Sequence, residues 1–375
     1  MSTTIRAIDA RVYRAPIAQP VTTSFGVMRD RPALFVRVED SDGRIGWGEA
    51  WCNFPSVGAE HRARLIDTVL SPLALAQPCD DPAAVFEMLS ARTAVLVLQS
   101  AEPGPIAQAI AGIDTALCDL AAQRAGLPLW RWLGGTAPEI GVYASGINPQ
   151  SPEVMALHQR ELGHRAFKLK LGFGHETDRA HLRSVRDAIG GDALLAADAN
   201  QAWSIDEALA IVDDLAAFEL AWLEEPLRVD RPPSEWLRLA RASRVPLAGG
   251  ENLAGRAAFD DALRVGALAV LQPDLAKWGG PSGCLPVARA VRAAGRRYAP
   301  HFLGGGIGLL ASAHLLAAVG GDGLLEIDSN PNPLRAATCG DVADVRGGRV
   351  TLGVTPGLGL APDALAAIER YRCAY

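Results

Sequence analysis

The sequence contains very little lysine. Lys and Arg together number 36, yet only Lys168, Lys170 and Lys277 are lysines, and arginine fills every other cationic position. A guanidinium stays protonated in proteins, whereas a buried lysine can lose its proton and act as a base. The three lysines are therefore candidates for chemistry. The alternative interpretation is a codon bias that left three lysines by accident.

Other absences exclude whole classes of function. The six cysteines lie far apart with no CxxC pair, which is typical of reduced thiols in a cytoplasmic protein. The net charge is −6 and no Lys/Arg run is present, which argues against nucleic-acid binding. The N-terminus lacks the apolar core of a signal peptide, and the most apolar stretches, such as 307–319, are too short for a membrane span. We therefore expect a cytoplasmic protein with neither nucleic-acid nor membrane partners.

The first third of the chain predicts a small α+β domain. The length of 375 residues is too great for one ordinary core and suits two domains. Strand-like and then helical segments follow one another at 5–16, 33–51 (with a turn at 41–43), 58–76, 82–98 and 105–125. Strands followed by helices indicate an α+β unit, to which we assign residues 1–130.

From about residue 140 the pattern changes to alternating strands and helices. Eight short apolar runs are separated by helical segments, namely IGVYASGI, AFKLKLG, ALLAADAN, LAWLEEP, VPLAGGEN, VLQPDLAK, RRYAPHF and GLLEIDS. This alternation is typical of parallel βαβ units, and eight of them predict an α/β fold of the (β/α)7β type, a TIM-like barrel, over residues 131–331. Residues 332–375 are expected to return to the first domain, which would cap the barrel.

Each predicted barrel strand after the first ends in an ionisable residue. Taking one per strand, they are Lys170, Asp198, Glu224, Glu251, Asp274, His301 and Glu326, and successive members are 23 to 28 residues apart. That spacing is about one βα unit, so the side chains should converge on the barrel mouth where the strands end. The shared position predicts one site rather than seven unrelated charges.

Three carboxylates in this series indicate a metal site. Asp198, Glu224 and Glu251 come from adjacent strands and would repel one another without a cation. Oxygen donors suit a hard ion such as Mg²⁺, and zinc is disfavoured because no His/Cys cluster accompanies them. The alternative is a salt-bridge network of these carboxylates with the lysines and arginines.

Two pairs of residues suit acid/base chemistry. Lys168 and Lys170 lie two apart in a strand, so their side chains point the same way, and one cation should lower the pKa of the other. Asp274 and His301 end neighbouring strands, and a carboxylate that bonds an imidazole fixes its tautomer and raises its basicity. We therefore predict two bases, on opposite sides of the mouth.

Taken together, these motifs resemble the enolase superfamily, and within it the mandelate racemase subgroup. AGIDTALCDLAAQRAGLPLWRWLGG at 111–135 is similar to the junction between cap and barrel. The motifs KLK, DAN, WLEEP, GGEN, QPDLAKWGG and PH follow in the family's order and spacing. The muconate-lactonizing branch has a lysine where Asp274 stands, so that branch is disfavoured.

The resemblance implies a role for each of these residues. Asp198, Glu224 and Glu251 would bind Mg²⁺, Lys170 and His301 with Asp274 would be the acid/base groups, Lys168 would lower the pKa of Lys170 and contact the substrate carboxylate, and Glu326 would hydrogen-bond the substrate. Asn200 and Asn252 would lie behind the metal ligands, and the role of Lys277 stays open. Phe25 and Trp51 lie in cap stretches that close over the substrate in the family, with ordinary cap packing as the alternative.

The implied reaction is removal of the proton next to a carboxylate. The carbon acid is very weak, so the developing enediolate needs concentrated positive charge beside it. Dehydration of an acid sugar or hydroxy acid to a 2-keto acid is favoured, because it is common among family members with this set of residues. The alternatives are a racemase or epimerase and, from another class, a non-catalytic metal- and carboxylate-binding protein. We expect a small-molecule carboxylate substrate and a homo-oligomer.

Overall fold

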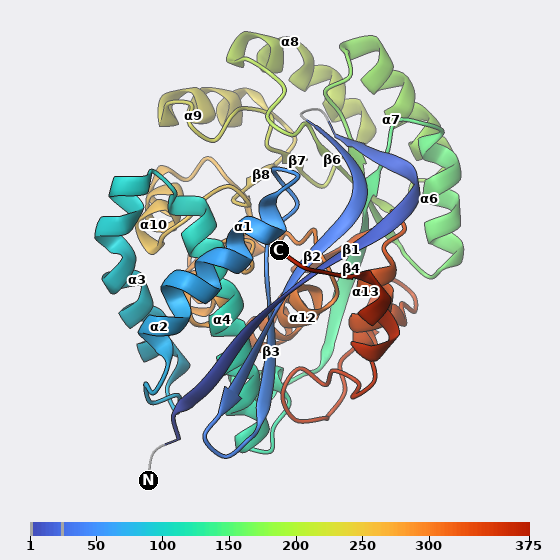
Figure 1. Cartoon of the computed structure of the whole chain (residues 1–375). Helices are drawn as coiled ribbons and strands as arrows, with labels where there is room; N and C mark the ends of the chain where they lie inside the picture. The colour runs from blue at the N-terminus through green and yellow to red at the C-terminus, as the bar shows by residue number, and fades with distance from the viewer. Residues whose placement is uncertain (1–2, 24–25) are drawn as a thin grey trace.

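A computed structural model describes residues 3–23 and 26–375 of the chain, and it contains two sheets (Figure 1). The first sheet is antiparallel and has the strand order β13-β1-β2-β3. Its members are β1 (Ile5–Thr23), β2 (Gly26–Asp40), β3 (Ile45–Ala50) and β13 (Arg372–Cys373). The predicted turn at 41–43 joins β2 to β3, where Asp40 accepts hydrogen bonds from the backbone N–H groups of Asp42 and Arg44, each at 2.9 Å.

Helices cover one side of this sheet and complete the α+β cap. They are α1 (Gly58–Leu65), the π-helical turn η1 (Ile66–Leu70), α2 (Ser71–Ala74), α3 (Pro82–Ser100) and α4 (Pro103–Arg124). The predicted helical segments are confirmed to within a few residues. The apolar positions of α4 that suggested a helix, including Ile106, Ile110 and Leu117, are buried in the cap core.

Strand β3 lies between α4 and the barrel. A Cβ atom added to Gly46 would lie 2.1 Å from the carbonyl oxygen of Ala116, and one added to Gly48 would lie 2.0 Å from that of Gly112. Only glycine therefore lets the strand approach α4 so closely. Because side chains alternate along a strand, Trp47 and Glu49, which flank Gly48, point away from α4 and toward the barrel.

The second unit is the predicted barrel. Its eight parallel strands are β4 (Glu139–Ile147), β5 (Ala166–Lys170), β6 (Leu194–Asp198), β7 (Leu223–Glu224), β8 (Leu247–Gly249), β9 (Val270–Leu271), β10 (Arg297–Tyr298) and β11 (Leu324–Asp328). They pair in chain order, and β11 returns to β4. The barrel is thus nearly closed, and the (β/α)7β prediction is confirmed.

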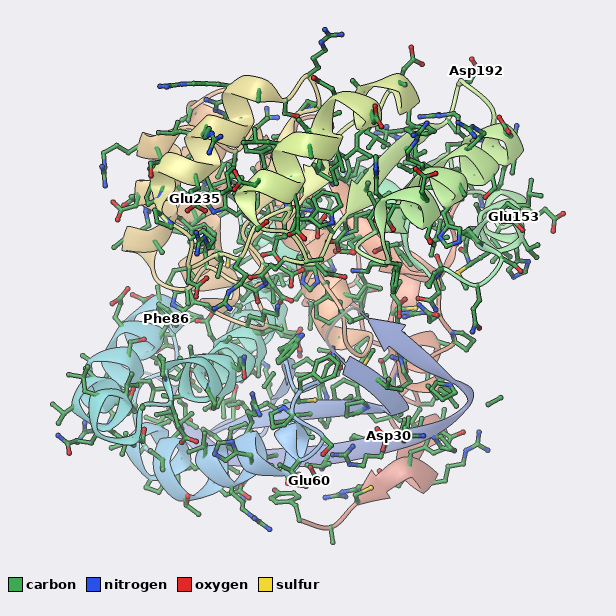
Figure 2. The ribbon with its side chains drawn as sticks, turned by 90° about the horizontal axis from the view of Figure 1, so that it is seen from above. Asp30, Glu60, Phe86, Glu153, Asp192 and Glu235 are labelled. Atoms are coloured by element: carbon green, nitrogen blue, oxygen red, sulfur yellow. The ribbon has the colours of Figure 1, made fainter. Side chains whose placement is uncertain are left out.

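Seven helices connect the strands and form the outer wall. They are α6 (Pro152–Glu161), α7 (His175–Ile189), α8 (Ile205–Leu215), α9 (Pro233–Ala242), α10 (Arg256–Val265), α11 (Gly280–Ala293) and α12 (Ile307–Val319). The short 3₁₀ turn η2 (Ala216–Phe218) follows α8, and α5 (Leu129–Trp132) precedes the barrel. In Figure 2, Glu153 and Glu235 lie on outer barrel helices and Asp192 lies in the turn after α7, whereas Asp30, Glu60 and Phe86 lie in the cap on the opposite side.

The C-terminal segment touches both units. It contains α13 (Pro333–Thr338), η3 (Gly340–Ala343), β12 (Arg349–Thr351) and η4 (Ala366–Tyr371) before β13. Strand β12 pairs antiparallel with β4 of the barrel, and β13 pairs antiparallel with β1 of the cap.

One cap helix, α3, is long and apolar enough to cross a membrane by length and composition. Only 22% of its most apolar window is buried, and Val95 and Leu98 are 70% and 80% exposed. A single helix of this kind is weak evidence for a membrane. The shorter apolar helix α12 is largely buried in the barrel wall. The expected absence of a membrane partner stays a prediction.

A buried ion pair joins the two units. Arg31 of β2 contacts the carboxylate of Asp328 at the end of β11, and Arg335 of α13 contacts the same carboxylate at 3.0 Å. Burial alone would raise the pKa of Asp328, but the two guanidinium groups outweigh it and lower the pKa to about 2. The ionised carboxylate therefore stabilises the folded state.

Replacing Asp328 with asparagine should lower the free energy of unfolding at pH 7 by about 3–5 kcal/mol, because the buried guanidinium group of Arg31 and the partly buried one of Arg335 lose their charged partner. The lowered pKa means that the ionic contribution, about 2 kcal/mol, is present above pH ~4 and is lost as the pH falls toward 2. The difference in the free energy of unfolding between wild type and variant, measured with urea, should therefore become smaller over that pH range. Asp230→Asn, which breaks an exposed pair with Arg228, should leave stability nearly unchanged. A difference that is independent of pH would contradict this account.

Candidate active site

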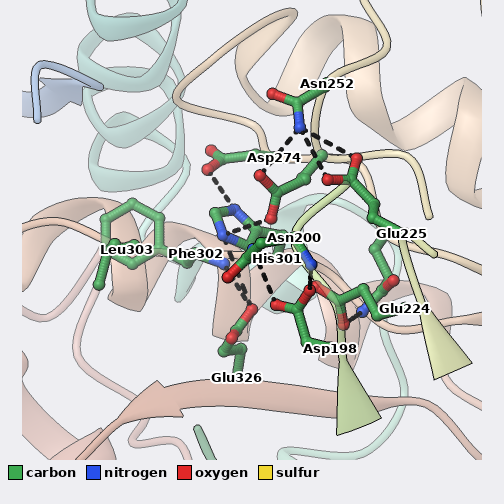
Figure 3. A network of polar contacts seen from close by, with 12 residues as sticks. Asp198, Asn200, Glu224, Glu225, Asn252, Asp274, His301, Phe302, Leu303 and Glu326 are labelled. Atoms are coloured by element: carbon green, nitrogen blue, oxygen red, sulfur yellow. Dashed lines mark hydrogen bonds and ion pairs between the residues drawn. The ribbon is translucent and has the colours of Figure 1, made fainter. Parts of the chain in front are cut away.

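The predicted ionisable residues meet at the mouth of the barrel. Lys170 of β5 is in register with Asp198 of β6, which is in register with Glu224 of β7. Figure 3 shows that Asp198, Glu224, Asp274, His301 and Glu326 form one continuous network of polar contacts. All three lysines of the chain join this network, which favours the chemical interpretation of their scarcity over accident.

Lys168 lies at the bottom of the network. Its ammonium group lies 2.7 Å from Glu224 Oε2 and 2.8 Å from Glu326 Oε1, and its side chain is fully buried. Burial would lower the pKa of Lys168, but the two carboxylates outweigh burial and hold the pKa well above its usual value. The lysine therefore acts here as a fixed cation. It is not among the residues that line the cavity described below, and its contact with a substrate carboxylate stays a prediction.

Lys170 lies above it, beside Asp198. Its Nζ is 2.6 Å from Asp198 Oδ2, and Asn200 donates to the same carboxylate from its backbone N–H and its side chain. Burial lowers the pKa of Lys170 and so does the charge of Lys168, as the sequence predicted. Asp198, with smaller contributions from Glu224 and Glu251, outweighs both, so the net shift is upward. The prediction of a lowered pKa is wrong for this arrangement, because it did not include the 2.6 Å contact.

The predicted pairing of Asp274 with His301 is confirmed. Nδ1 of His301 lies 2.8 Å from Asp274 Oδ2, and the other Asp274 oxygen accepts a 2.8 Å hydrogen bond from the backbone N–H of Ala276. Nε2 of His301 lies 2.9 Å from Glu251 Oε2. Burial would lower the pKa of His301, but Glu251, Glu326 and Asp274 raise it well above its usual value. The raised pKa favours the protonated imidazolium, which donates hydrogen bonds from both ring nitrogens.

Lys277 and Asn252 form the upper side of the network. Nζ of Lys277 lies 3.1 Å from Glu251 Oε1 and 4.9 Å from the ring centroid of Trp51. Asn252 donates to both oxygens of Glu225 at 3.0 Å. Lys277 thus links a barrel carboxylate to an aromatic ring of the cap. The sequence had left the role of Lys277 open, and these are its contacts in the structure.

Several polar residues of the network had no predicted role. Glu225 is buried, and burial followed by the charges of Glu251 and Asp198 raises its pKa to about 8. Gln272 donates to Glu224 at 2.5 Å, and Ser145 donates to Glu326. Gln272 lies in the QPDLAK motif and Glu225 lies in the WLEEP motif, and this position is the sequence feature that could have identified them as site residues.

Two loops at the mouth hold strained backbone. Asn200, Gln201 and Glu225 have positive φ values of 45°, 63° and 38°, a conformation that non-glycine residues rarely adopt. The backbone N–H of Gln201 donates to the carbonyl oxygen of Glu225 at 2.7 Å, so the two loops hold one another. Strain of this kind concentrates at functional sites.

The three proposed metal ligands do not form a preformed cage. Over residues 3–23 and 26–375, no group of three or more His, Cys, Asp or Glu side chains is close enough together to hold a metal ion. Asp198, Glu224 and Glu251 instead contact Lys170, Lys168 and the Lys277–His301 pair. The salt-bridge network that the sequence left as an alternative is therefore present.

The charge balance of the network nevertheless fits a divalent cation. Its six carboxylates are Asp198, Glu224, Glu225, Glu251, Asp274 and Glu326, against three lysines and His301. A fully ionised network with His301 protonated would carry two excess negative charges, and burial, followed by the neighbouring carboxylates, raises the pKa of Glu224 to about 7 and that of Glu225 to about 8. Oxygen donors with an excess charge of this size suit Mg²⁺.

A cavity of about 210 Å³ opens onto the network. Barrel residues Lys170, Asn200, Gln201, Glu225, Glu251, Asn252, Lys277, His301 and Leu303 line it together with Trp51 and Phe54 of the cap. Lys170 is the last residue of β5 and His301 follows β10, and these two strands are not neighbours in the sheet. Trp51 lines the cavity, and its Nε1 is a buried donor with no partner among the described residues. Phe25, the other cap residue predicted to close over substrate, lies outside the described residues.

Comparisons with known proteins identify the family of this chain. Residues 7–134 match the mandelate racemase/muconate lactonizing enzyme N-terminal domain, and residues 153–366 match the family described as enolase C-terminal domain-like. The chain is 31% identical to D-galactarolactone cycloisomerase of Agrobacterium fabrum over 90% of this chain and 91% of that protein. It is 27% identical to arabinonate dehydratase of Saccharolobus solfataricus over 90% and 89% of the two chains.

Solved structures give the same result. A mandelate racemase/muconate lactonizing enzyme from Bordetella bronchiseptica RB50 is 56% identical, covers 98% of this chain and 99% of its own, and superposes with a TM-score of 0.93. A racemase from Streptomyces coelicolor A3(2) with bound magnesium is 30% identical, with 98% and 100% coverage and a TM-score of 0.87. The chain therefore belongs to the mandelate racemase/muconate lactonizing enzyme family of the enolase superfamily.

Proposed function

We propose that the protein is a Mg²⁺-dependent enzyme that removes the proton α to a carboxylate, and that its reaction is dehydration of an acid sugar to a 2-keto acid. The observation that carries this proposal is that Lys170 and His301, from strands that are not neighbours, line one cavity next to Glu251. A substrate held there would meet a proton-transfer group on each side. Its class follows from the sugar-acid names of the relatives, which include a galactarolactone cycloisomerase and an arabinonate dehydratase.

The proposed roles follow the contacts of each residue. Asp198, Glu224 and Glu251 would hold Mg²⁺, which when bound would supply the positive charge that stabilises enediolate oxygens. Lys170 would accept the α-proton, and His301, oriented by Asp274, would donate a proton to the departing β-hydroxyl group, which leaves as water. The enol that remains ketonises to the 2-keto acid. Glu326, fixed by Lys168 and Ser145, would hydrogen-bond the substrate from the third side.

Cap residues complete the pocket in this proposal. The unpartnered Nε1 of Trp51 would donate a hydrogen bond to a substrate hydroxyl or carboxylate, since a buried donor without a partner is costly. We propose Trp51 as a substrate contact for this reason. A small-molecule carboxylate as substrate, a homo-oligomeric assembly and a cytoplasmic location complete the proposal.

A racemase or epimerase is the second candidate. The same two groups could remove and return the proton on opposite faces, and the Streptomyces relative is named a racemase. Two curated relatives are named cycloisomerases, a reaction class that also fits one proton removal followed by a different second step. A non-catalytic binding protein is disfavoured, because neither the acid nor the base is missing.

The experiment that tests the proposal is a screen of sugar acids with Mg²⁺ present. Aldonic and aldaric acids of both configurations at C2 and C3 are incubated with the enzyme, and 2-keto acid is trapped with semicarbazide. We expect 2-keto acid from a small stereochemical subset. Epimerised starting material without keto acid would select the second candidate, and no reaction with any member would contradict the proposal.

The Lys168→Met variant should move the ascending limb of the pH–rate profile, where activity increases with pH, to higher pH. Lys170 must be neutral to accept a proton, so activity rises as the pH passes upward through its pKa. The charge of Lys168 lowers that pKa, and removing it also leaves Glu224 and Glu326 without their cation, so both effects raise it. The measurement is kcat/KM against pH.

Lys277→Met is the matched control for that limb. It also deletes a lysine that pairs with a network carboxylate, but Lys277 contacts Glu251 rather than Asp198. Its rate can fall, yet the pH of the limb should stay close to that of wild type. If the limb stays in place in Lys168→Met, a group other than Lys170 controls it.

A further inference from the structure

A glycine-rich turn follows His301, with the sequence GGGIG at 304–308. The carboxylate of Glu49, from strand β3 of the cap, lies inside this turn. One Glu49 oxygen accepts a 2.5 Å hydrogen bond from the backbone N–H of Gly305, and the other accepts a 2.8 Å bond from that of Gly308. Glu49 is 1% exposed and touches none of the proposed acid, base or metal-binding groups through a hydrogen bond.

The glycines are required by this close approach. A Cβ atom on Gly304 or Gly305 would lie 2.7 or 2.9 Å from Glu49 Oε1. One on Gly308 would lie 2.4 Å from the ring of Phe302, the residue next to His301. The cap side is equally specific, because Gly46 and Gly48 press β3 against α4 and strand alternation turns Glu49 toward the barrel.

Glu49 also replaces a missing helix cap. Helix α12 begins at Ile307, and its N-cap residue is Gly306, which has no side chain to accept from the first backbone N–H groups. A carboxylate at a helix N-terminus satisfies such donors and interacts favourably with the helix dipole. The acceptor that most helices take from their own sequence comes here from the other domain.

The same cap segment reaches the loop that carries Asp274. The backbone N–H of Trp51 donates to the carbonyl oxygen of Ala276 at 3.1 Å, and the N–H of Ala276 donates to Asp274 at 2.8 Å. Asn53 donates through Nδ2 to the carbonyl oxygen of Leu303 at 2.7 Å. Residues 49–53 of the cap thus hold both loops from which the Asp274–His301 pair is built.

From these contacts we propose that Glu49 is a positioning residue, which caps α12 from the neighbouring domain and thereby keeps His301 aligned with Asp274. The inference rests on the proposed function in that it takes His301 as the acid/base group whose alignment matters. It also implies that His301 becomes aligned with Asp274 when the cap docks on the barrel. Lys170, on β5, lies outside the reach of this coupling.

The first test needs no substrate. Full-length protein labelled with ¹⁵N-histidine is studied by NMR with Mg²⁺ present, and the His301 signals are assigned by their loss in His301→Asn. In Glu49→Gln, the side chain loses its negative charge, and its amide N–H₂ group cannot accept the hydrogen bonds of the backbone N–H groups of Gly305 and Gly308. The Nδ1 proton of His301, held by Asp274, should then exchange with solvent about tenfold faster, the factor that corresponds to loss of one helix cap.

Asp119→Asn is the matched control. Asp119 is also a buried carboxylate that accepts two backbone N–H groups, from Trp47 of β3 at 2.9 Å and from Leu358 at 2.8 Å, but it does not contact the 304–308 turn. It should lower the thermal unfolding temperature without changing the His301 exchange rate. An equal change in both variants, or none in Glu49→Gln, would overturn the proposal.

Kinetics supply the second measurement, on the sugar acid that the screen identifies. Glu49→Gln should lower kcat by about 10- to 100-fold with little change in KM, because alignment rather than binding is lost. Glu49→Asp keeps the charge and should recover part of the rate, and it serves as the test if the glutamine variant does not fold. Normal turnover in Glu49→Asp with an unaltered His301 signal would also contradict the proposal. If no sugar acid reacts but the Nδ1 proton of His301 exchanges faster in Glu49→Gln, only the proposed reaction would be contradicted.

Discussion

The His301→Asn variant should lose turnover by about 10²- to 10⁴-fold, yet still exchange the α-proton of one substrate enantiomer with D₂O. Lys170 remains on its side of the cavity and can still remove the proton that faces it. Lys170→Ala should give the reciprocal result, in which exchange from that face is lost and exchange through His301 is retained. The measurement is ¹H NMR of the α-proton in D₂O, with product formation followed in the same tube.

The outcome also separates the two candidate reactions. In a racemase, each single variant would exchange one enantiomer and interconvert none. In a dehydratase, wild type would release a trappable 2-keto acid and incorporate solvent deuterium when the enol ketonises. Asp274→Asn serves as a graded control, because His301 would keep its place but lose the carboxylate at 2.8 Å that sets its tautomer. Wild-type turnover in both single variants would mean that neither residue transfers the proton.

Chelation with EDTA should reduce turnover to the background rate, and added Mg²⁺ should restore it. Six carboxylates in the network face three lysines and one histidine, and a divalent cation would offset the excess negative charge of the ionised carboxylates. A second measurement is independent of catalysis: Mg²⁺ should raise the thermal unfolding temperature, since it binds the folded state only. Full activity in EDTA would remove the basis of the metal assignment.

Two variants of the network, one inside and one outside the proposed ligand set, test which carboxylates bind the metal. Glu251→Gln should show neither recovery of activity nor thermal stabilisation at ordinary Mg²⁺ concentration. Glu225→Gln removes a carboxylate that hydrogen-bonds Asn252 and lies outside the proposed ligand set, so it should still respond to Mg²⁺ in the thermal assay. Equal responses in the two variants would place the ligands elsewhere in the network.

The sequence predicted the fold and the composition of the site because both depend on regular spacing. An ionisable residue every 23 to 28 positions, always where a strand ends, needs only the barrel topology to be brought to one place. The pairing of Asp274 with His301 followed from the same argument, since β9 and β10 are neighbours in the sheet. Neither argument requires knowledge of how any individual side chain is oriented.

What the sequence could not predict depends on single contacts. The direction of the Lys170 pKa shift is decided by whether Asp198 or Lys168 lies closer, and a distance of 2.6 Å decides it. The ion pairs of Lys168 with Glu224 and Glu326, at 2.7 and 2.8 Å, likewise depend on side-chain geometry that spacing does not give. The role of Glu49 was missed because its partners stand more than 250 residues away and are backbone groups, which leave no mark in the sequence except the glycines.

The scarcity of lysine has a practical consequence for labelling. All of the chain's ε-amino groups lie in one network, and the side chains of Lys168, Lys170 and Lys277 are 0%, 17% and 13% exposed. Amine-reactive dyes, cross-linkers and coupling resins therefore find no lysine on the outer surface, and a small acylating reagent can reach ε-amino groups only through the cavity. Mass spectrometry of Lys170 and Lys277 after brief acylation would then read cavity occupancy directly, as protection by whichever carboxylate is bound.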